Sequence, residues 1–476
     1  MTRLPTEING LTTGKHSKGI AFAGTGLAPR AARPVAPSSS ECRRPRLSVA
    51  IVDEVNDSSV WLDPGVPGGG SEMNATSRRR HDVDWLRVLA VLLVFVTHSA
   101  QVFSPIDDWH VQNPELSWTL GQFTVFMGPW LMPLFMLLAG QSAWFALRRR
   151  GSGRFLRERT FKLLIPLVAG TLLVVPPQIY LRRLSRGEFE GNFLEFYPHF
   201  FDGIFPEGNF SYGHLWFLAY LFSYALAGLP IFHLLKRPRG RRFLHAVSRV
   251  VDWPGGILWL FLPLALGQIL LRPHFPQTTG AVVGDWATHF WFFPIYVVGF
   301  AIMLEPRLGQ AVDRDWRTAL FPGILTSLGL WLFAWPGEVY ERIPVDPSLW
   351  HVVFWTGFML ASWSWIVFFV GAARAYLSFS SPFLRYWGDR VYPFYVFHQT
   401  VIVIVAYWVV QGPGVVGVKF LLVLVGSLAG TLLILEVLGR IPHLRGLFGL
   451  RKVQPPEEAS SEDREEKGVG GHPGPT

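Results

Sequence analysis

The sequence predicts an all-α polytopic membrane protein with about ten transmembrane helices and both termini in the cytoplasm. The chain has 476 residues, of which 50% are hydrophobic and only 16% are charged, so it is too apolar to cover a soluble core with polar surface. Apolar segments near the ~20 residues that a bilayer requires recur along most of its length. Most lysines and arginines lie in alternate loops between these segments, which is typical of a membrane topology.

The apolar segments define ten predicted spans. The weakest of these predictions are the shortest segment and the segment that contains Pro176 and Pro177, because two prolines bend or end a helix. The ten predicted spans are 85–104, 123–147, 161–181, 213–235, 256–272, 286–304, 317–335, 351–373, 392–410 and 415–437.

The charges of the connecting segments favour one orientation. One set of alternate segments carries 26 lysines and arginines, whereas the other set carries 6. By the positive-inside rule, the basic set and both termini lie in the cytoplasm, which requires an even number of spans. The basic segments are 78–80, 148–162, 236–249, 305–317, 374–390 and 440–452; the others are 105–121, 182–212, 272–285, 336–350 and 411–420.

Two terminal regions flank the predicted membrane domain at 73–450. Residues 1–72 contain no spanning segment and are rich in Gly, Pro, Ser and Arg, so we expect a disordered extension without a cleaved leader. An additional hypothesis is that translation starts at Met73, just before three consecutive arginines, and that the extension is an over-extended start. Residues 451–476 are rich in Glu and predict a disordered acidic cytoplasmic tail.

Cysteine content and charge exclude several other classes. The single cysteine, Cys42, cannot close an intrachain disulfide or supply a zinc-thiolate site, and we expect no metal site. The net charge of +9 resides in loops that flank apolar segments rather than in one basic domain. We therefore expect membrane lipid, and not nucleic acid, as a partner.

The first span carries an unusual polar stripe. Asp84, Arg87 and His98 lie within roughly 60° of one another on a helix, and Arg87 and His98 are separated by roughly 16 Å along its axis. This pattern predicts the wall of a tunnel, with Arg87 and Asp84 at the cytoplasmic mouth and His98 deeper. The cation suits a phosphate or carboxylate, and the imidazole suits a general base for a hydroxyl. The alternatives are an ion pair that anchors the helix end and a histidine bonded to a neighbouring carbonyl.

Further candidate residues lie at the ends of other spans. Arg157, Arg159 and Lys162 open the third span and could face the mouth where an anionic cofactor would enter, while the remaining basic residues of this loop suit topology and lipid headgroups. His214 and Trp216 begin the fourth span, and Tyr395 and His398 lie in the ninth. The aromatic residues suit an interfacial belt, but a belt does not require imidazole.

These residues together resemble the membrane acyltransferase-3 family from about His81 to Leu450. The resemblance depends on four features: Asp84-Trp85-Leu86-Arg87 with His98 eleven residues after the arginine, the basic approach to the third span at 154–166, His214-Leu215-Trp216-Phe217-Leu218, and Tyr392-Pro393-x-Tyr395-x-x-His398. Lys162 stands where the family often has arginine. The fourth-span motif and residues 436–450 resemble the branch that contains the succinyltransferase of glucan biosynthesis.

The resemblance implies an O-acyltransferase of a bacterial inner or plasma membrane. Such an enzyme moves an acetyl or succinyl group from cytoplasmic acyl-CoA to a hydroxyl of a carbohydrate or glycolipid of the cell envelope. Acyl-CoA would be a co-substrate, with no permanently bound cofactor. His98 would activate the acceptor or first take the acyl group covalently, and Arg87 would bind CoA phosphates or the thioester oxyanion.

The remaining candidates receive supporting roles in the same reaction. Asp84 would orient Arg87 as part of the catalytic set. Arg157, Arg159 and Lys162 would bind the cofactor, and the substrate would contact His214, Trp216, Tyr395 and His398.

Two other classes of protein remain open. A transporter or flippase for a polar or anionic envelope precursor also needs buried charges along a polar path, although the sequence shows no duplicated halves. A non-catalytic scaffold would lose only stability on replacement of His98 by alanine. Consumption of a labelled acyl-CoA thioester separates the enzyme from both.

Overall fold

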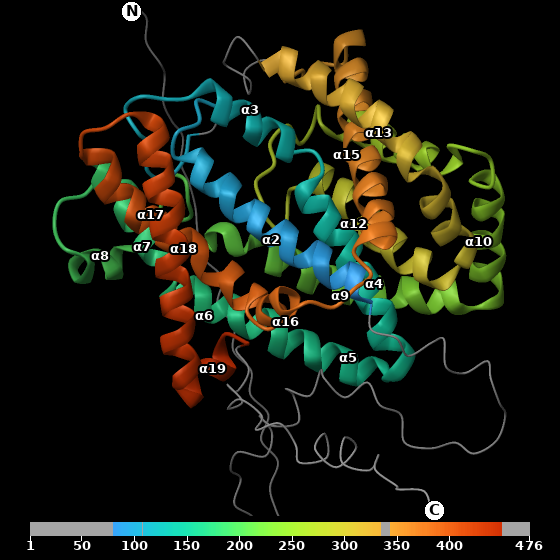
Figure 1. The fold of residues 1–476 in the computed structure, drawn as a ribbon, viewed down its shortest axis with the longest axis horizontal. Helices are drawn as coiled ribbons and strands as arrows, with labels where there is room; N and C mark the ends of the chain where they lie inside the picture. Colours follow the sequence, from blue (N-terminus) through green and yellow to red (C-terminus); the bar gives the residue numbers. More distant parts are fainter. Residues whose placement is uncertain (1–79, 107, 335–342, 450–476) are drawn as a thin grey trace, which may run out of the picture. The chain divides into compact units, whose positions relative to one another are not determined.

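The computed structural model describes residues 80–106, 108–334 and 343–449. These residues are predominantly helical and contain no β-strand, apart from one isolated bridge between Ile204 and Phe210. The predicted fold class, an all-α polytopic membrane protein, is confirmed (Figure 1). The predicted extension at 1–72 and tail at 451–476 lie outside the described residues.

Within the described residues, the longer connections between the helices follow α2, α8 and α11. In chain order the helices are α2 (His81–Gln101), α3 (Trp118–Met127), α4 (Leu131–Arg149), α5 (Ser152–Arg159), the π-helical η2 (Thr160–Leu164), α6 (Ile165–Leu173), α7 (Pro176–Ser185), α8 (Phe193–His199), the 3-10 helix η3 (Gly213–Leu215), α9 (Trp216–Lys236), α10 (Pro238–Val250), the 3-10 helix η4 (Gly256–Leu260), α11 (Phe261–Leu271), α12 (Trp286–Leu304), α13 (Pro306–Ala334), α15 (Leu349–Tyr376), α16 (Pro382–Gly388), α17 (Val391–Gln411), α18 (Val416–Arg440) and α19 (Pro442–Leu447).

Eight helical runs within the described residues are long and apolar enough to cross a membrane. They coincide with eight of the ten predicted spans. The prediction at 256–272 falls on the shorter apolar run Gly256–Leu271, and the prediction at 317–335 falls within α13, which borders the undescribed segment 335–342. The count of ten and the cytoplasmic termini therefore stay predictions. The eight runs are His81–Gln101, Trp118–Arg149, Ser152–Ser185, Gly213–Lys236, Trp286–Leu304, Leu349–Tyr376, Val391–Gln411 and Val416–Arg440.

The third run is broken where the sequence places two prolines. Helix α6 ends at Leu173, and α7 begins at Pro176, whose missing N–H costs nothing at the first position of a helix. A π-helical turn interrupts the same run at Thr160–Leu164. The break makes α7 a separate short helix that can pack against α17 and carries Gln178 into the protein interior.

Helix α2 is central to the described bundle. It packs against α3, α4, α15, α16, α17 and α18, while α17 in turn packs against α2, α7 and α18. A close crossing of α4 and α12 supports this arrangement, because a Cβ at Gly140 would lie 1.9 Å from the Tyr296 carbonyl oxygen and one at Gly299 would lie 2.1 Å from the Leu137 carbonyl oxygen. Only glycine permits the two backbones to approach so closely.

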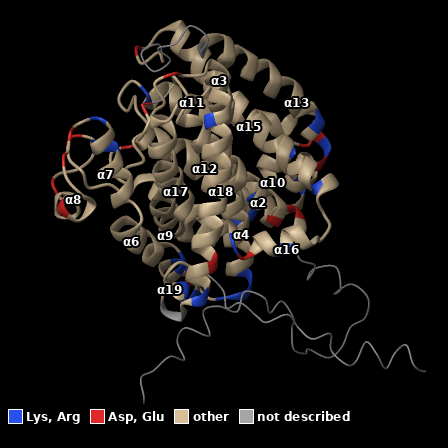
Figure 2. Cartoon of the chain, turned by 60° about the vertical axis from the view of Figure 1, so that its left-hand side comes forward, with Lys and Arg blue, Asp and Glu red and all other residues tan. Residues whose placement is uncertain are grey.

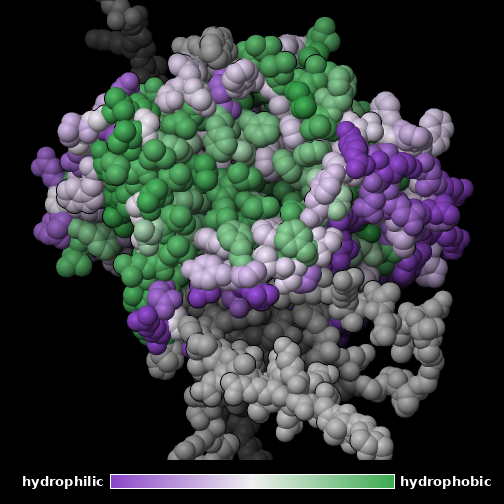
Figure 3. Space-filling view, in the orientation of Figure 1, coloured by the Kyte–Doolittle hydropathy of each residue, from purple (hydrophilic) through white to green (hydrophobic). Residues whose placement is uncertain are grey.

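The surface matches a lipid environment. Helix α18 exposes a series of large apolar side chains, and Figure 3 shows a broad hydrophobic face with hydrophilic residues toward its margins. Charged residues likewise gather toward the helix ends and connecting segments in Figure 2. Apolar surface of this extent would be unfavourable in water, so it supports insertion in a membrane. The exposed apolar residues of α18 include Val418, Leu421, Leu422, Val425, Leu433 and Val437.

Candidate active site

His98 lies near the C-terminal end of α2 and pairs with a second histidine from α17. Its Nδ1 is 3.0 Å from Nε2 of His398, and the two rings are nearly parallel, with an interplanar angle of 6°. His398 is fully buried, and its Nδ1 lies 2.7 Å from the carbonyl oxygen of Tyr395. The structure thus joins two histidines that are 300 positions apart in the sequence.

A third histidine completes the cluster. His214, in η3, packs edge-on against His398 with ring centroids 5.4 Å apart, and its Nε2 is 3.0 Å from the carbonyl oxygen of Val396. The hydroxyl of Tyr395 donates a hydrogen bond of 2.6 Å to the carbonyl of His214. Three of the residues predicted to contact substrate therefore gather around His98.

Trp216 occupies a different environment from the histidine cluster. Its ring stacks on Phe292 of α12 and meets Tyr220 of its own helix edge-on, with centroids 5.9 Å and 5.1 Å away. Trp216 thus packs between α9 and α12. Its predicted contact with substrate stays untested.

A network of amides extends the histidine cluster and was not predicted from the sequence. Nε2 of Gln178 donates to Oγ1 of Thr400 at 2.6 Å and lies 3.4 Å from Nδ1 of His214. Oε1 of Gln178 accepts a hydrogen bond of 3.1 Å from Gln399, the residue that follows His398. The available signal was the presence of buried amides in apolar helices, since such groups need partners.

The loop between α2 and α3 covers the same cluster. Nε2 of Gln399 donates to Nε2 of His110 at 3.1 Å, and the ring of Trp109 lies 6.3 Å from that of His98. Burial of its ring nitrogens, reinforced by the positive charge of Arg182, lowers the pKa of His110 to about 3. His110 is therefore neutral at physiological pH, and its Nε2 can accept the amide hydrogen bond.

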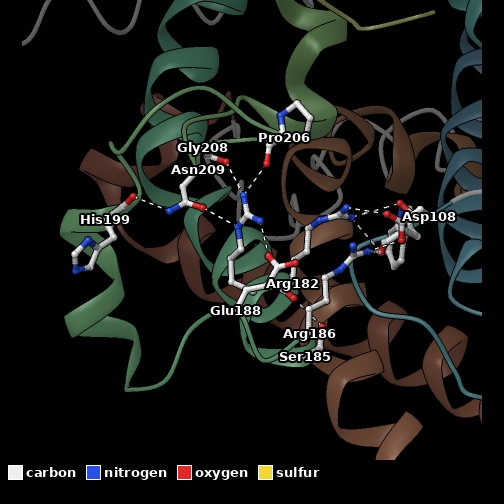
Figure 4. A network of polar contacts seen from close by, with 11 residues as sticks. Asp108, Arg182, Ser185, Arg186, Glu188, His199, Pro206, Gly208 and Asn209 are labelled. Carbon is white, nitrogen blue, oxygen red and sulfur yellow. Dashed lines mark hydrogen bonds and ion pairs between the residues drawn. The ribbon is translucent and has the colours of Figure 1, made fainter. Parts of the chain in front are cut away.

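Two arginines at the C-terminal end of α7 hold this loop in place. Arg182 and Arg186 both pair with the carboxylate of Asp108, and both also donate to the carbonyl of Trp109 (Figure 4). Burial alone would raise the pKa of Asp108, but its hydrogen bonds with the two arginines and their charges hold it below its usual value. We call this group, formed by Asp108, Arg182 and Arg186, the loop clamp.

The opposite end of α2 is charged and more open. Nη1 of Arg87 lies 3.3 Å from Oδ1 of Asp84, and Nη2 donates to the hydroxyl of Ser142 on α4. The side chain of Arg87 is 36% exposed, so the guanidinium remains accessible to an anion. The predicted ion pair is present, and Ser142 is an additional contact that the sequence did not indicate.

The three cationic residues predicted to assist Arg87 lie on neighbouring elements. Arg157 lies over the ring of Phe161, and Arg159 lies over that of Phe155. Lys162 lies in the π-helical turn, and its carbonyl accepts a hydrogen bond of 2.6 Å from Tyr392 of α17. These contacts place the residues near the beginning of the third run but do not test their predicted role.

The bundle and its buried histidine cluster define a polytopic membrane protein with a polar site inside an apolar domain. The sequence matches the family described as "Acyltransferase domain", the acyltransferase-3 family, over residues 80–436, and the chain belongs to this family. The protein is an acyltransferase, as its sequence resemblance implied.

Named relatives agree with this assignment. The chain is 22% identical over 334 residues to the "Glucans biosynthesis protein C" of Salmonella paratyphi B and to that of Salmonella enteritidis PT4, a match that covers 66% of this chain and 85% of each relative. The corresponding protein of Salmonella schwarzengrund is 21% identical with the same coverage. No solved structure matches the chain significantly.

Proposed function

We propose that this membrane acyltransferase moves an acetyl or succinyl group from cytoplasmic acyl-CoA to a hydroxyl of a carbohydrate or glycolipid of the bacterial cell envelope. The observation that carries the proposal is the distribution of groups along α2. An accessible cation, Arg87, stands at one end, and the imidazole of His98 stands at the other within a buried hydrogen-bonded cluster. Donor recognition and acceptor activation are thereby separated along one helix.

His98 is the general base in this proposal. Its Nε2 takes the proton of the acceptor hydroxyl as the acceptor oxygen attacks the thioester carbonyl carbon. The carbon–sulfur bond breaks, and the CoA thiolate leaves and recovers the proton from His98. One ester forms, one thioester is lost, and the imidazole returns to its starting state.

Arg87 is the proposed donor-binding residue. A guanidinium binds phosphate through charge-assisted hydrogen bonds, and its contacts with Asp84 and Ser142 fix its direction. Arg157, Arg159 and Lys162 would add positive charge where the donor approaches. The long pantetheine arm of CoA would then run along α2 toward His98, over the roughly 16 Å that separates the two residues.

Two observations support a carbohydrate acceptor on the extracytoplasmic side. The relatives are named for glucan biosynthesis, and the surroundings of His98 supply an indole, Trp109, and an amide, Gln399. The loop that contains Trp109 belongs to the set of segments with few basic residues, for which the positive-inside rule favours the extracytoplasmic face.

The test uses the full-length protein in inside-out membrane vesicles, which expose the cytoplasmic face to radiolabelled acetyl-CoA or succinyl-CoA. We expect label in envelope carbohydrate with the wild type. We expect a loss on the order of 10²-fold or more in turnover with His98→Gln, because a positioned base contributes about that much. The variant should still insert into the membrane and bind the donor, since glutamine retains hydrogen bonding without a titratable nitrogen.

The matched control is His233→Gln, which replaces an exposed histidine of α9 that bonds to Ser152. This variant should transfer label at the wild-type rate. Full activity of His98→Gln would show that His98 is not the general base. An intact thioester in the presence of wild-type protein and cell envelope would contradict acyl-CoA as the donor.

A further inference from the structure

We infer that His398 is a positioning residue that fixes the tautomer of His98, so that Nε2 of His98 presents a lone pair to the acceptor hydroxyl. This inference rests on the proposed function of His98 as the base. It gives His398 a different role from the substrate contact predicted from the sequence. A chain of hydrogen bonds runs from the backbone carbonyl of Tyr395 through His398 to His98.

The backbone carbonyl of Tyr395 determines which nitrogen of His398 carries the proton. The carbonyl oxygen of Tyr395 can only accept a hydrogen bond, and it lies 2.7 Å from Nδ1 of His398. Nδ1 must therefore carry a proton. A neutral imidazole carries only one, so Nε2 of His398 has a lone pair and acts as an acceptor.

His398 in turn determines which nitrogen of His98 carries the proton. Nε2 of His398 lies 3.0 Å from Nδ1 of His98, and because the former accepts, the latter must donate. The proton of neutral His98 is thereby held on Nδ1, which leaves its Nε2 unprotonated. Within the part of the chain that the structure describes, no protein group hydrogen-bonds this nitrogen, and the ring is only half-buried. Nε2 is therefore the atom available to a substrate.

The surroundings prevent His398 from reversing its ring. His398 is fully buried. The ring of Phe394 stacks on it with centroids 6.0 Å apart and an interplanar angle of 10°, and the ring of His214 meets it edge-on with centroids 5.4 Å apart. His214 is fixed in turn, because its Nε2 donates to the Val396 carbonyl while its Nδ1 faces the amide of Gln178. A reversed His398 would lose its bond to Tyr395 and leave a buried N–H unpaired, which costs about 1–3 kcal/mol.

The arrangement also stabilises the protonated intermediate. When His98 takes the acceptor proton on Nε2, its Nδ1–H becomes a charge-assisted donor to neutral His398. The second histidine thus supports the cation without a buried counter-charge. Both nitrogens of His398 are already bonded, so it acts through His98 rather than on the substrate.

The test compares two replacements of His398 in full-length protein in membranes, with succinyl-CoA and acetyl-CoA as probes. His398→Leu removes the acceptor, and we expect turnover to fall on the order of 10²- to 10⁴-fold with little change in KM for the donor, as when a catalytic histidine loses the partner that sets its tautomer. His398→Gln can still accept from His98 through Oε1. We expect it to retain activity within about 10-fold of the wild type.

Phe397→Leu provides the packing control, since it shortens a ring next to His398 on α17 that packs on Phe448 and touches neither hydrogen bond of His398. It should retain turnover close to that of His398→Gln or better. The direct readout is ¹⁵N NMR of histidine-labelled wild type, with His98→Gln used to assign the His98 resonance. A protonated Nδ1 and unprotonated Nε2 are expected in the wild type and in His398→Gln.

The outcomes separate this inference from the proposed function. Wild-type turnover in His398→Leu, together with an inactive His98→Gln, would overturn the positioning role and leave the base intact. Wild-type turnover in His98→Gln would instead defeat the proposed function. A proton on Nε2 of His98 in the wild type would overturn the inference even if His398→Leu failed to accumulate, because it is observed without any replacement of His398.

Discussion

The two ends of α2 are built in different ways. At the Arg87 end, Arg87 contacts Asp84, three positions away on the same helix, and Ser142 of the adjacent α4. At the His98 end, the cluster draws on α2, α7, η3, α17 and the loop before α3, and the partners His398, His214 and Gln178 are buried. A partly exposed arginine such as Arg87 can bind and release the acyl-CoA donor. An imidazole that acts as a base, such as His98, must be held in one tautomer and one orientation.

The two ends also differ in what a lost contact costs. A partly exposed ion pair such as Asp84–Arg87 contributes about 0–1 kcal/mol to stability. A buried amide or imidazole that loses its partner costs about 1–3 kcal/mol. Because the Asp84–Arg87 pair adds little stability, substitutions at the Arg87 end should change donor binding with little effect on folding. Substitutions at the His98 end disturb the buried contacts that hold the base, so they should change turnover.

After the losses of turnover expected for the two histidine variants, the largest effect that we predict from this comparison is in donor binding by Arg87→Ala. Removal of charge-assisted bonds to phosphate costs about 1.5–3 kcal/mol, which raises the KM for acyl-CoA about 10- to 100-fold. Turnover at saturating donor should change much less. The measurement is initial rate against acyl-CoA concentration in membrane vesicles, normalised to the amount of inserted protein.

Arg157→Ala and Arg159→Ala serve as comparison variants. Each removes a cation from a segment with several others, so we expect a smaller rise in KM than for Arg87→Ala. An unchanged donor dependence in Arg87→Ala would leave this arginine with only its structural pair. Equal effects for all three would indicate general electrostatic attraction instead of a specific contact.

The same contrast explains what the sequence could predict. Helical spacing alone placed Asp84 and Arg87 together, because residues three apart share a helix face. Spacing could also place His98 on that face, but its partner His398 is 300 positions away, and only the packing of α17 on α2 brings them into contact. The amides of Gln178 and Gln399 were visible as polar groups in apolar segments, yet nothing local indicated which partners they would meet.

The fold was predictable to a similar degree. Hydrophobic length located α12 at 286–304 and α17 within one residue, since a span must match the thickness of a bilayer. The break before Pro176 followed from proline chemistry. The π-helical turn at Thr160–Leu164 and the start of the second run at Trp118 were not predicted, because both depend on how neighbouring helices pack.

A smaller effect is predicted for Gln178→Leu at the His98 end. The substitution removes the amide that faces His214 and the acceptor for Gln399, but it touches neither His98 nor His398 directly. We expect turnover to fall about 10-fold, equivalent to roughly 1.4 kcal/mol, with an unchanged KM for the donor. Single-turnover rates at saturating acyl-CoA measure this change.

Thr400→Val is the matched control for this substitution. It removes the hydroxyl that accepts from Gln178 and donates to the carbonyl of Val174, and it keeps the side-chain volume. Its effect on turnover should be smaller, because Gln178 retains its contacts with His214 and Gln399. A change confined to donor KM in Gln178→Leu would contradict the proposed division between the two ends of α2.

The smallest effect concerns the loop clamp, which lies beyond the His98 end. Asp108→Asn removes the charge that Arg182 and Arg186 share, but the arginines keep their bonds to the Trp109 carbonyl. The Asp108 side chain is 64% exposed, so solvent screening limits the loss to about 1 kcal/mol or less. We expect a reduction in turnover of about fivefold or less.

The pH dependence of this effect distinguishes the loop clamp from a simple packing contact. Because the pKa of Asp108 is lower in the folded protein than its ordinary value of 3.8, its contribution to stability is present above that value and is lost as the pH falls through the folded pKa. The difference in Tm between wild type and Asp108→Asn should therefore be present at pH 7 and shrink toward zero in acid. Asp202→Asn, which replaces an exposed acid paired with His199 and not with arginine, should leave turnover unchanged. A Tm difference for Asp108→Asn that persists undiminished below the folded pKa would show that the carboxylate charge does not hold the loop over His98.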